Sequence, residues 1–77
     1  MRFVVLAYGS VPVPGGTTLG SVDTATSVQD RVLRDGTYDG PASSLRGVHV
    51  VEASDLDAVV DLLPATGTFE VRPAGVP

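Results

Sequence analysis

The fold is decided by an apolar stretch near the N-terminus, Arg2-Phe3-Val4-Val5-Leu6-Ala7-Tyr8. Its length and its content of β-branched and aromatic residues favour a strand over a helix. The run is apolar without alternation, which is typical of a strand that is covered on both faces. We therefore place residues 2–8 at the centre of a sheet.

The next segment, residues 9–23, predicts a flexible loop. It contains four glycines and two prolines before residue 21, which exclude a regular helix. The Gly15-Gly16 pair raises the question of a phosphate-binding loop. It lacks the Gly-Lys-Ser/Thr ending of such a loop, and no helical pattern follows it. A plain connection is therefore the favoured interpretation.

Residues 24–38 predict a β-hairpin, because they are rich in Thr, Val, Leu and Tyr. Two turns are compatible with them. Asp35-Gly36 is the stronger local signal, but it leaves only two residues for the second arm. A turn at Asp30-Arg31 pairs residues 27–29 with residues 32–34. The sequence alone leaves this register open.

The C-terminal half predicts a strand, a helix and a second strand. Residues 47–53 form the first strand, and Ser54 is expected to cap the helix, with Asp57 three residues further on. The helix has one apolar stripe at the spacing i, i+3, i+4, i+7, made of Leu56, Val59, Val60 and Leu63. Pro64 ends the helix. Residues 68–72 alternate in polarity as a half-exposed strand does, and Pro73 is expected to end that strand.

These elements predict a single α+β domain over residues 1–77, with an antiparallel sheet and one helix. One helix of about ten residues does not cover a whole sheet face. A chain of 77 residues is also marginal as a monomer, and the absence of Cys excludes a disulfide staple. A homodimer that pairs two sheets is the simplest way to cover the remaining face.

The charge of the chain limits the classes of partner that it is expected to bind. Five cationic residues stand against nine carboxylates, for a net charge of -4, and no basic cluster is present. This pattern argues against binding of nucleic acid or of an anionic membrane surface. The longest apolar run falls far short of the roughly 20 residues that span a bilayer, and it is too short for a signal peptide. We expect a cytoplasmic protein without a metal, since no ligand spacing is present.

Several ordered segments resemble the YCII-related family, in the branch marked by an Asp-Gly-Pro-Phe motif. The segments are Thr24-Ala25-Thr26, Asp39-Gly40-Pro41, Gly47 to Glu52, Asp55 to Ala58, and Gly67 to Pro73. The resemblance implies a dimeric α+β barrel of ferredoxin-like protomers that pair sheet to sheet. That fold hosts lyases, isomerases, polyketide cyclases and small monooxygenases that need no cofactor.

The chain departs from this family in two places. Family members have a long helix where residues 9–23 lie here, and some relatives place a His of a His–Asp dyad near that helix. This chain has no His there. The motif itself reads Asp39-Gly40-Pro41-Ala42, with Ala in place of Phe. The departures imply either a degenerate member or one with a different task.

The candidate catalytic residues are His49, Asp39 and Tyr8. His49 is the only side chain whose ordinary pKa suits proton transfer near neutral pH. Its side chain points to the opposite face of the strand from Val48 and Val50. The alternative interpretation is a histidine that only packs in the structure. Asp39 in an Asp-Gly-Pro turn most often bonds its own backbone. Tyr8 ends the first strand, where its hydroxyl either meets a substrate or simply reaches the surface.

The candidate substrate-binding residues are Arg46, Arg72 and Tyr38. A guanidinium binds a carboxylate or an enolate through two parallel hydrogen bonds. Isolated Arg residues are more often partners in surface ion pairs, here with Glu52 or Glu70.

Two functions are compatible with these residues. The first is a small enzyme without a cofactor, of the cyclase, isomerase or lyase type, acting on a hydrophobic small molecule of bacterial secondary metabolism. The second is a non-catalytic dimeric accessory protein that binds a ligand or a partner. A pocket inside the dimer lined by His49, Tyr8 and Arg would favour the enzyme, whereas a filled interior would favour the binding protein.

Overall fold

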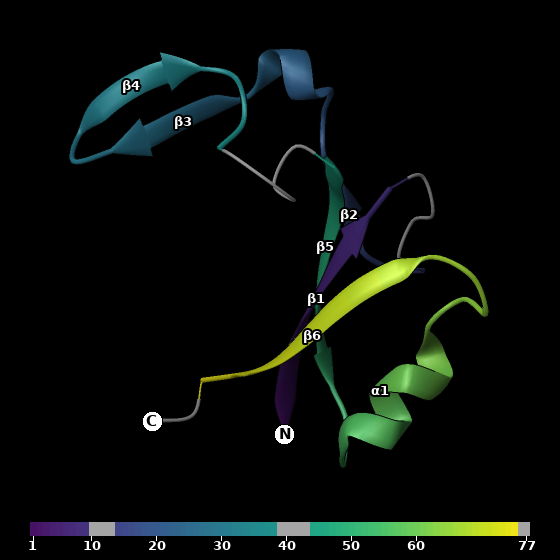
Figure 1. Ribbon diagram of the computed structural model, residues 1–77. Coiled ribbons are helices and arrows are strands. Elements are labelled where there is room, and N and C mark those ends of the chain that lie inside the picture. Colours follow the sequence, from purple (N-terminus) through teal and green to yellow (C-terminus); the bar gives the residue numbers. More distant parts are fainter. Residues whose placement is uncertain (10–13, 39–43, 76–77) are drawn as a thin grey trace.

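The computed structural model describes residues 1–9, 14–38 and 44–75 and contains two antiparallel sheets (Figure 1). The larger sheet has four strands in the order β2-β5-β1-β6. These strands are β1 (Arg2–Tyr8), β2 (Thr17–Thr18), β5 (Leu45–Glu52) and β6 (Thr68–Ala74). A separate hairpin joins β3 (Thr26–Gln29) to β4 (Val32–Asp35), and the helices are α1 (Leu56–Leu62) and the 3-10 turn η1 (Val22–Thr24). The fold is therefore α+β with one α-helix in the described residues, and its strand order is compatible with a ferredoxin-like sheet.

Strand β1 has the predicted bounds and the predicted central place. Its residues Phe3, Val5 and Ala7 are buried on the face that α1 covers, together with Val59 of the helix. Partly buried side chains surround this core: Val51, Ala53, Leu63, Phe69 and Val71. The core is small because one short helix covers only part of one face.

The opposite face of the sheet is apolar on β1 and β5, whereas β6 contributes Thr68, Glu70 and Arg72 to it. Strand alternation and the register between strands place five residues of β1 and β5 there, which we call the open face: Val4, Leu6, Tyr8, Val48 and Val50. Val50 is 54% exposed, and the other four are half-buried. The residues of β1 are therefore buried on the face beneath α1 and half-buried on the open face.

The predicted end of the last strand at Pro73 is wrong, because β6 continues to Ala74. The Ala53 N–H donates to the Met1 carbonyl, so the odd-numbered residues of β1 direct their backbone groups toward β5. Strand β6 pairs Pro73 with Phe3. The backbone nitrogen of Pro73 consequently faces the free edge of the sheet, where a missing N–H breaks no hydrogen bond.

Strand β5 begins at Leu45, two residues before the predicted start. Its Gly47 is buried where β2 crosses closely, since a Cβ on Gly47 would lie 3.3 Å from the Thr17 carbonyl oxygen. Strand β2 and η1 are two short elements inside the segment predicted as a loop, residues 9–23. Residues 10–13 of that segment lie outside the described part of the chain.

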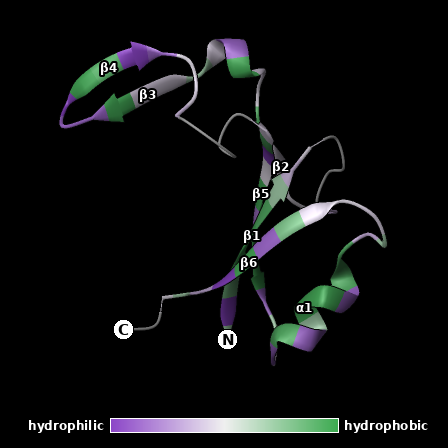
Figure 2. Cartoon of the chain, viewed as in Figure 1, coloured by the Kyte–Doolittle hydropathy of each residue, from purple (hydrophilic) through white to green (hydrophobic). Residues whose placement is uncertain are grey.

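The hairpin of β3 and β4, which we call the arm, turns at Asp30-Arg31. These two residues have φ angles of 52° and 66°, as a two-residue hairpin turn of the I′ type requires. The register pairs Val28 with Leu33 and Gln29 with Val32. Of the two turns that the sequence allowed, the one at Asp30-Arg31 is therefore confirmed. Figure 2 shows that apolar residues occur in both strands of the arm, although the arm lies away from the core.

The sequence predicted Ser54 as the cap of helix α1, and this prediction is wrong. The structure shows Asp55 as the cap. The Asp55 carboxylate accepts a hydrogen bond from the Ala58 N–H at 2.9 Å. Of the predicted apolar stripe, only Val59 is buried and Leu63 is partly buried. Leu56 and Val60 are both 53% exposed, because the short helix meets the sheet along a narrow line.

Candidate ligand-binding hollow

His49 lies on the face of the sheet that α1 covers. It stands opposite Val5 in the register of β5 and β1, and Val48 and Val50 point to the other face, as alternation predicted. The ring lies close to the backbone of Gly15, where a Cβ would be 3.8 Å from the ring atoms Cε1 and Nε2. The loop before β2 therefore packs beside the imidazole.

A small apolar hollow opens between this loop, the sheet and α1. It has a volume of about 160 Å³. Its lining is contributed by β1, β5, α1 and the loop before β2: Val5, Pro14, His49, Val51, Val59, Leu62 and Leu63. Six of these seven residues are apolar, so His49 supplies the side-chain hydrogen-bonding group of the lining.

The topology explains why the hollow exists. Helix α1 follows β5 and leads into β6, and its Val59 packs on the β1 residues Phe3, Val5 and Ala7. Among the described residues, the segment at Pro14 and Gly15 lies beside His49 on the half of this face that belongs to β5. The predicted absence of a helix after β1 thus leaves room beside His49.

Tyr8 and His49 lie on opposite faces of the sheet, because Tyr8 belongs to the open face. Tyr8 lines a separate, shallow hollow at the end of the strands, together with Ser44, Phe69 and Glu70. The structure therefore does not bring these two predicted catalytic residues together. Asp39, the third, lies outside the described residues.

The predicted substrate-binding residues lie on three different segments of the chain. Arg72 forms an ion pair with Glu70 at the edge strand, as the bland interpretation of this residue expected. Arg46 donates from Nη1 to the Leu45 carbonyl at 3.3 Å. Tyr38 is 61% exposed at the base of the arm. None of the three lines the hollow beside His49.

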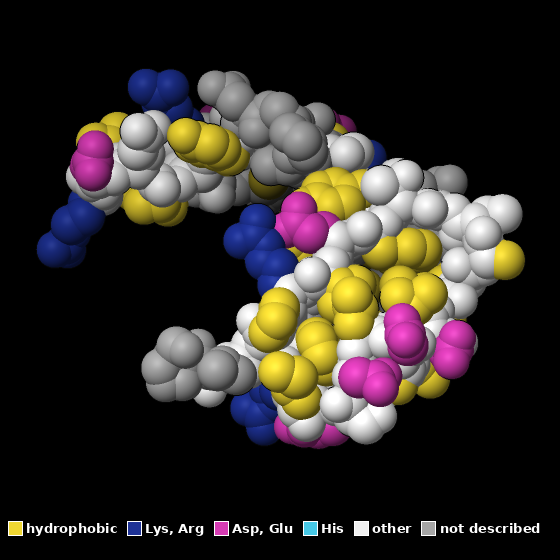
Figure 3. Space-filling view, turned by 60° about the horizontal axis from the view of Figure 1, so that its bottom comes forward, with side chains coloured by type: hydrophobic (Ala, Val, Ile, Leu, Met, Phe, Trp, Pro, Cys, Tyr) yellow, Lys and Arg dark blue, Asp and Glu magenta, His cyan; other side chains and the backbone are white. Residues whose placement is uncertain are grey.

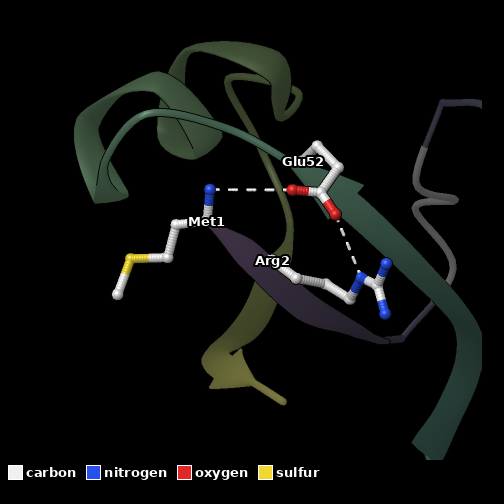
Figure 4. Close-up of polar contacts among 3 residues, drawn as sticks. All are labelled: Met1, Arg2 and Glu52. Atoms are coloured by element: carbon white, nitrogen blue, oxygen red, sulfur yellow. Dashed lines mark hydrogen bonds and ion pairs between the residues drawn. The ribbon is translucent and has the colours of Figure 1, made fainter. Parts of the chain in front are cut away.

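The ion pairs of the described residues lie at the surface. The Glu52 carboxylate lies 3.1 Å from Arg2 Nε and 3.6 Å from the Met1 amino group (Figure 4). All three side chains are about half exposed or more, so these pairs contribute little to stability.

Over residues 1–9, 14–38 and 44–75 we find no group of three His, Cys, Asp or Glu side chains placed to hold a metal ion. The helices in the same part of the chain are too short to cross a lipid bilayer.

The sequence indicated His49 but missed the residues around it. Alternation placed His49 and Val51 on one face, yet it did not reveal that Pro14 and Leu62 complete a hollow there. The available signal was the loop rich in Gly and Pro, which stands where a helix would otherwise cover the face.

Comparison with known proteins found no matching family model, no matching curated protein and no matching solved structure. The resemblance to the YCII-related family therefore stays a prediction from the sequence motifs.

Proposed function

We propose that the protein is a homodimeric module that binds a small apolar molecule in the hollow beside His49. The observation that carries this proposal is the lining of the hollow, which is apolar except for one imidazole. Small-molecule sites typically combine apolar walls with few polar groups that orient the ligand. An accessory role in secondary metabolism, a cytosolic location and membership of the YCII-related family belong to the same proposal.

The size of the hollow indicates the class of ligand. Its volume is about 160 Å³, and a dry apolar cavity of about 150 Å³ is large enough for benzene. The neutral imidazole offers one donor and one acceptor. A single-ring compound with one hydroxyl or carbonyl group, such as phenol, matches both the volume and the polar group.

The exposed surface supports the homodimer. The chain exposes 5568 Å², whereas a compact monomer of 7.9 kDa exposes about 4,400 Å². The excess is of the order that one protomer buries in a stable complex, about 800 Å². The radius of gyration is 13.7 Å, compared with about 11.5 Å for a compact domain of this length.

The open face is the surface that fits this contact. It is centred on Val4, Leu6 and Val48, and it is continuous across β1 and β5. Sheet-to-sheet pairing through this face would leave the hollow accessible, because the hollow lies on the α1 side. Ligand binding and dimer formation are thus separable.

Titration with phenol, followed by NMR, tests the binding site. We expect saturable shifts at His49 and Val51 in the millimolar range or below. Leu62→Trp fills the rim of the hollow and should weaken binding at least tenfold. Leu56→Trp is the matched control, because Leu56 is similarly exposed on the same helix but does not line the hollow. Shifts that do not saturate, or equal effects of the two variants, would refute the binding site.

Sedimentation equilibrium tests the dimer. Val50→Arg places a charge on the open face and should raise the dimer dissociation constant at least a hundredfold. Val60→Arg is the control, because Val60 is equally exposed but lies on α1. A wild-type chain that sediments as a folded monomer at millimolar concentration would refute the homodimer.

Catalysis at His49 is the second candidate. It is favoured by one observation: His49 is the titratable side chain in the lining of an apolar hollow. A cyclase, isomerase or lyase without a cofactor needs a group that takes up and returns a proton, which an imidazole does near neutral pH. No second titratable side chain lines the hollow among the described residues, and we therefore rank this activity below ligand binding.

A further inference from the structure

The arm stands apart from the four-stranded sheet of its own chain. It consists of residues 26–35, and Figure 1 shows it projecting from one end of the four-stranded sheet. Val28 and Leu33 stand directly opposite each other across its two strands. They are 63% and 70% exposed. A cross-strand apolar pair of this kind is normally buried.

The energetics of a hairpin make this exposure informative. A two-stranded hairpin without a covering surface is at best marginally stable in water. The arm gains little from the described part of its own chain, since none of its ten residues is buried. A stable arm therefore needs a surface for its apolar pair that the protomer does not supply.

Two hydrogen bonds extend the pairing of β3 and β4 at the base of the arm. The Gly36 N–H donates to the Ala25 carbonyl at 2.9 Å, and the Ser27 hydroxyl donates to the Gly36 carbonyl at 2.6 Å. Val28 and Leu45 line the same hollow of about 440 Å³ between the arm and the end of β5. Residues of β3 thus lie across this hollow from the start of β5.

The arm overhangs the open face. In Figure 1 the large sheet is seen nearly edge-on, with α1 on one side and the arm extending over the other side. Figure 3 shows a recess between the arm and the body of the molecule. A partner chain that packs on the open face would therefore also lie beneath the arm.

We propose that the arm clasps a second copy of this chain, with Val28 and Leu33 as its contact residues. This inference rests on the proposed homodimer and adds a contact to it. Two-fold symmetry supplies two arms, so each protomer both gives and receives one. The excess exposed surface of about 1,200 Å² is larger than a typical contribution of about 800 Å² per partner, which leaves room for the arm as well as the open face.

The charges of the arm are compatible with a second copy of this chain as the binding partner. Two Arg and two Asp residues lie on residues 26–35, so the arm has no net charge. On the sheet face that includes the open face, β6 carries Glu70 and Arg72, again one charge of each sign. Surfaces of balanced charge do not repel a copy of themselves, whereas binding of a nucleic acid or an acidic membrane requires a cluster of cations.

The double variant Val28→Ser/Leu33→Ser tests the arm, with Val32→Ser as the matched control. Val32 is 60% exposed on the opposite face of the same hairpin. We expect the double variant to raise the dimer dissociation constant at least tenfold in sedimentation equilibrium, and Val32→Ser to change it less than twofold. In the wild type, hydrogen exchange at residues 27–34 should become faster on dilution below the dissociation constant.

The outcomes separate this inference from the proposed homodimer. A wild-type chain that is monomeric would remove the homodimer and the arm contact together. A wild-type dimer whose dissociation constant is unchanged in the double variant would overturn only the arm contact. An equal rise in the dimer dissociation constant in Val32→Ser would also overturn the arm contact, because the contact would then not belong to the face of Val28 and Leu33.

Discussion

Val5 and His49 stand opposite each other on β1 and β5, and both face α1. Val5 is 1% exposed, whereas His49 is half-buried and borders the hollow. The same pair of strands thus joins the centre of the core to the candidate ligand site. A substitution of His49 therefore alters the lining of the hollow without replacing a residue of the core.

The variant His49→Gln should leave the protein folded and remove any proton transfer in the hollow. Glutamine is polar and similar in size, but it does not titrate near neutral pH. We expect the free energy of unfolding to change by less than about 1 kcal/mol. Exchange of the α-protons of cyclohexanone in D2O, measured by NMR, reports proton transfer. A large loss of stability with unchanged exchange would leave His49 with a packing role only.

The variant Asp55→Ala should lower the free energy of unfolding by about 1 kcal/mol, because it removes the acceptor for the Ala58 N–H. Ser54→Ala should change it by less than about 0.5 kcal/mol. Urea denaturation at one protein concentration measures both. The reverse order would identify Ser54 as the working cap.

The variant Arg31→Gly should stabilise the arm by about 0.5–1 kcal/mol, because Arg31 has a φ of 66° that glycine adopts without strain. Arg34→Gly is the control in the extended part of β4, where glycine should destabilise the arm. Hydrogen exchange at residues 27–34 reports the difference. Faster exchange in Arg31→Gly would show that the turn conformation is not strained.

The variant Gly47→Val should separate β2 from β5. A Cβ at this position would lie 3.3 Å from the Thr17 carbonyl oxygen and 3.6 Å from the Ala7 Cβ. We expect a loss of about 1–3 kcal/mol for valine and a smaller loss for alanine. Exchange of the Leu19 N–H, which donates to the Arg46 carbonyl at 2.7 Å, should become faster. Unchanged exchange in the valine variant would contradict this contact.

The parts of the fold that the sequence predicted well are those with a strong pattern. The continuous apolar run predicted β1 and its bounds, because burial of a central strand leaves no polar position in it. Local turn chemistry was less decisive. Asp35-Gly36 is the stronger hairpin signal, but a turn at Asp30-Arg31 forms four residue pairs, including Val28 with Leu33. Pairing along the strands outweighs the cost of two residues with positive φ.

The candidate site was only half predictable. Alternation along β5 fixed which residues share a face with His49, but it did not determine which face α1 would cover. That depends on the crossover from β5 to β6 and on the loop at Pro14, which approaches from a distant part of the chain. Tyr8 is a candidate from the sequence because it ends the first strand, and His49 is one because an imidazole suits proton transfer. Their opposite faces follow from the register, which the sequence did not determine.

The position of Pro73 also limits how large an assembly can become. The free edge of β6 exposes the backbone of Phe69, Val71 and Pro73, and the last of these has no N–H to donate. A further strand that added at this edge would lack a hydrogen bond at that position. Growth from edge to edge, the route to open-ended fibres, is therefore impeded at β6. The proposed pairing through the open face would instead close at two copies, and concentrated solutions of the protein would then contain discrete particles and not polymers.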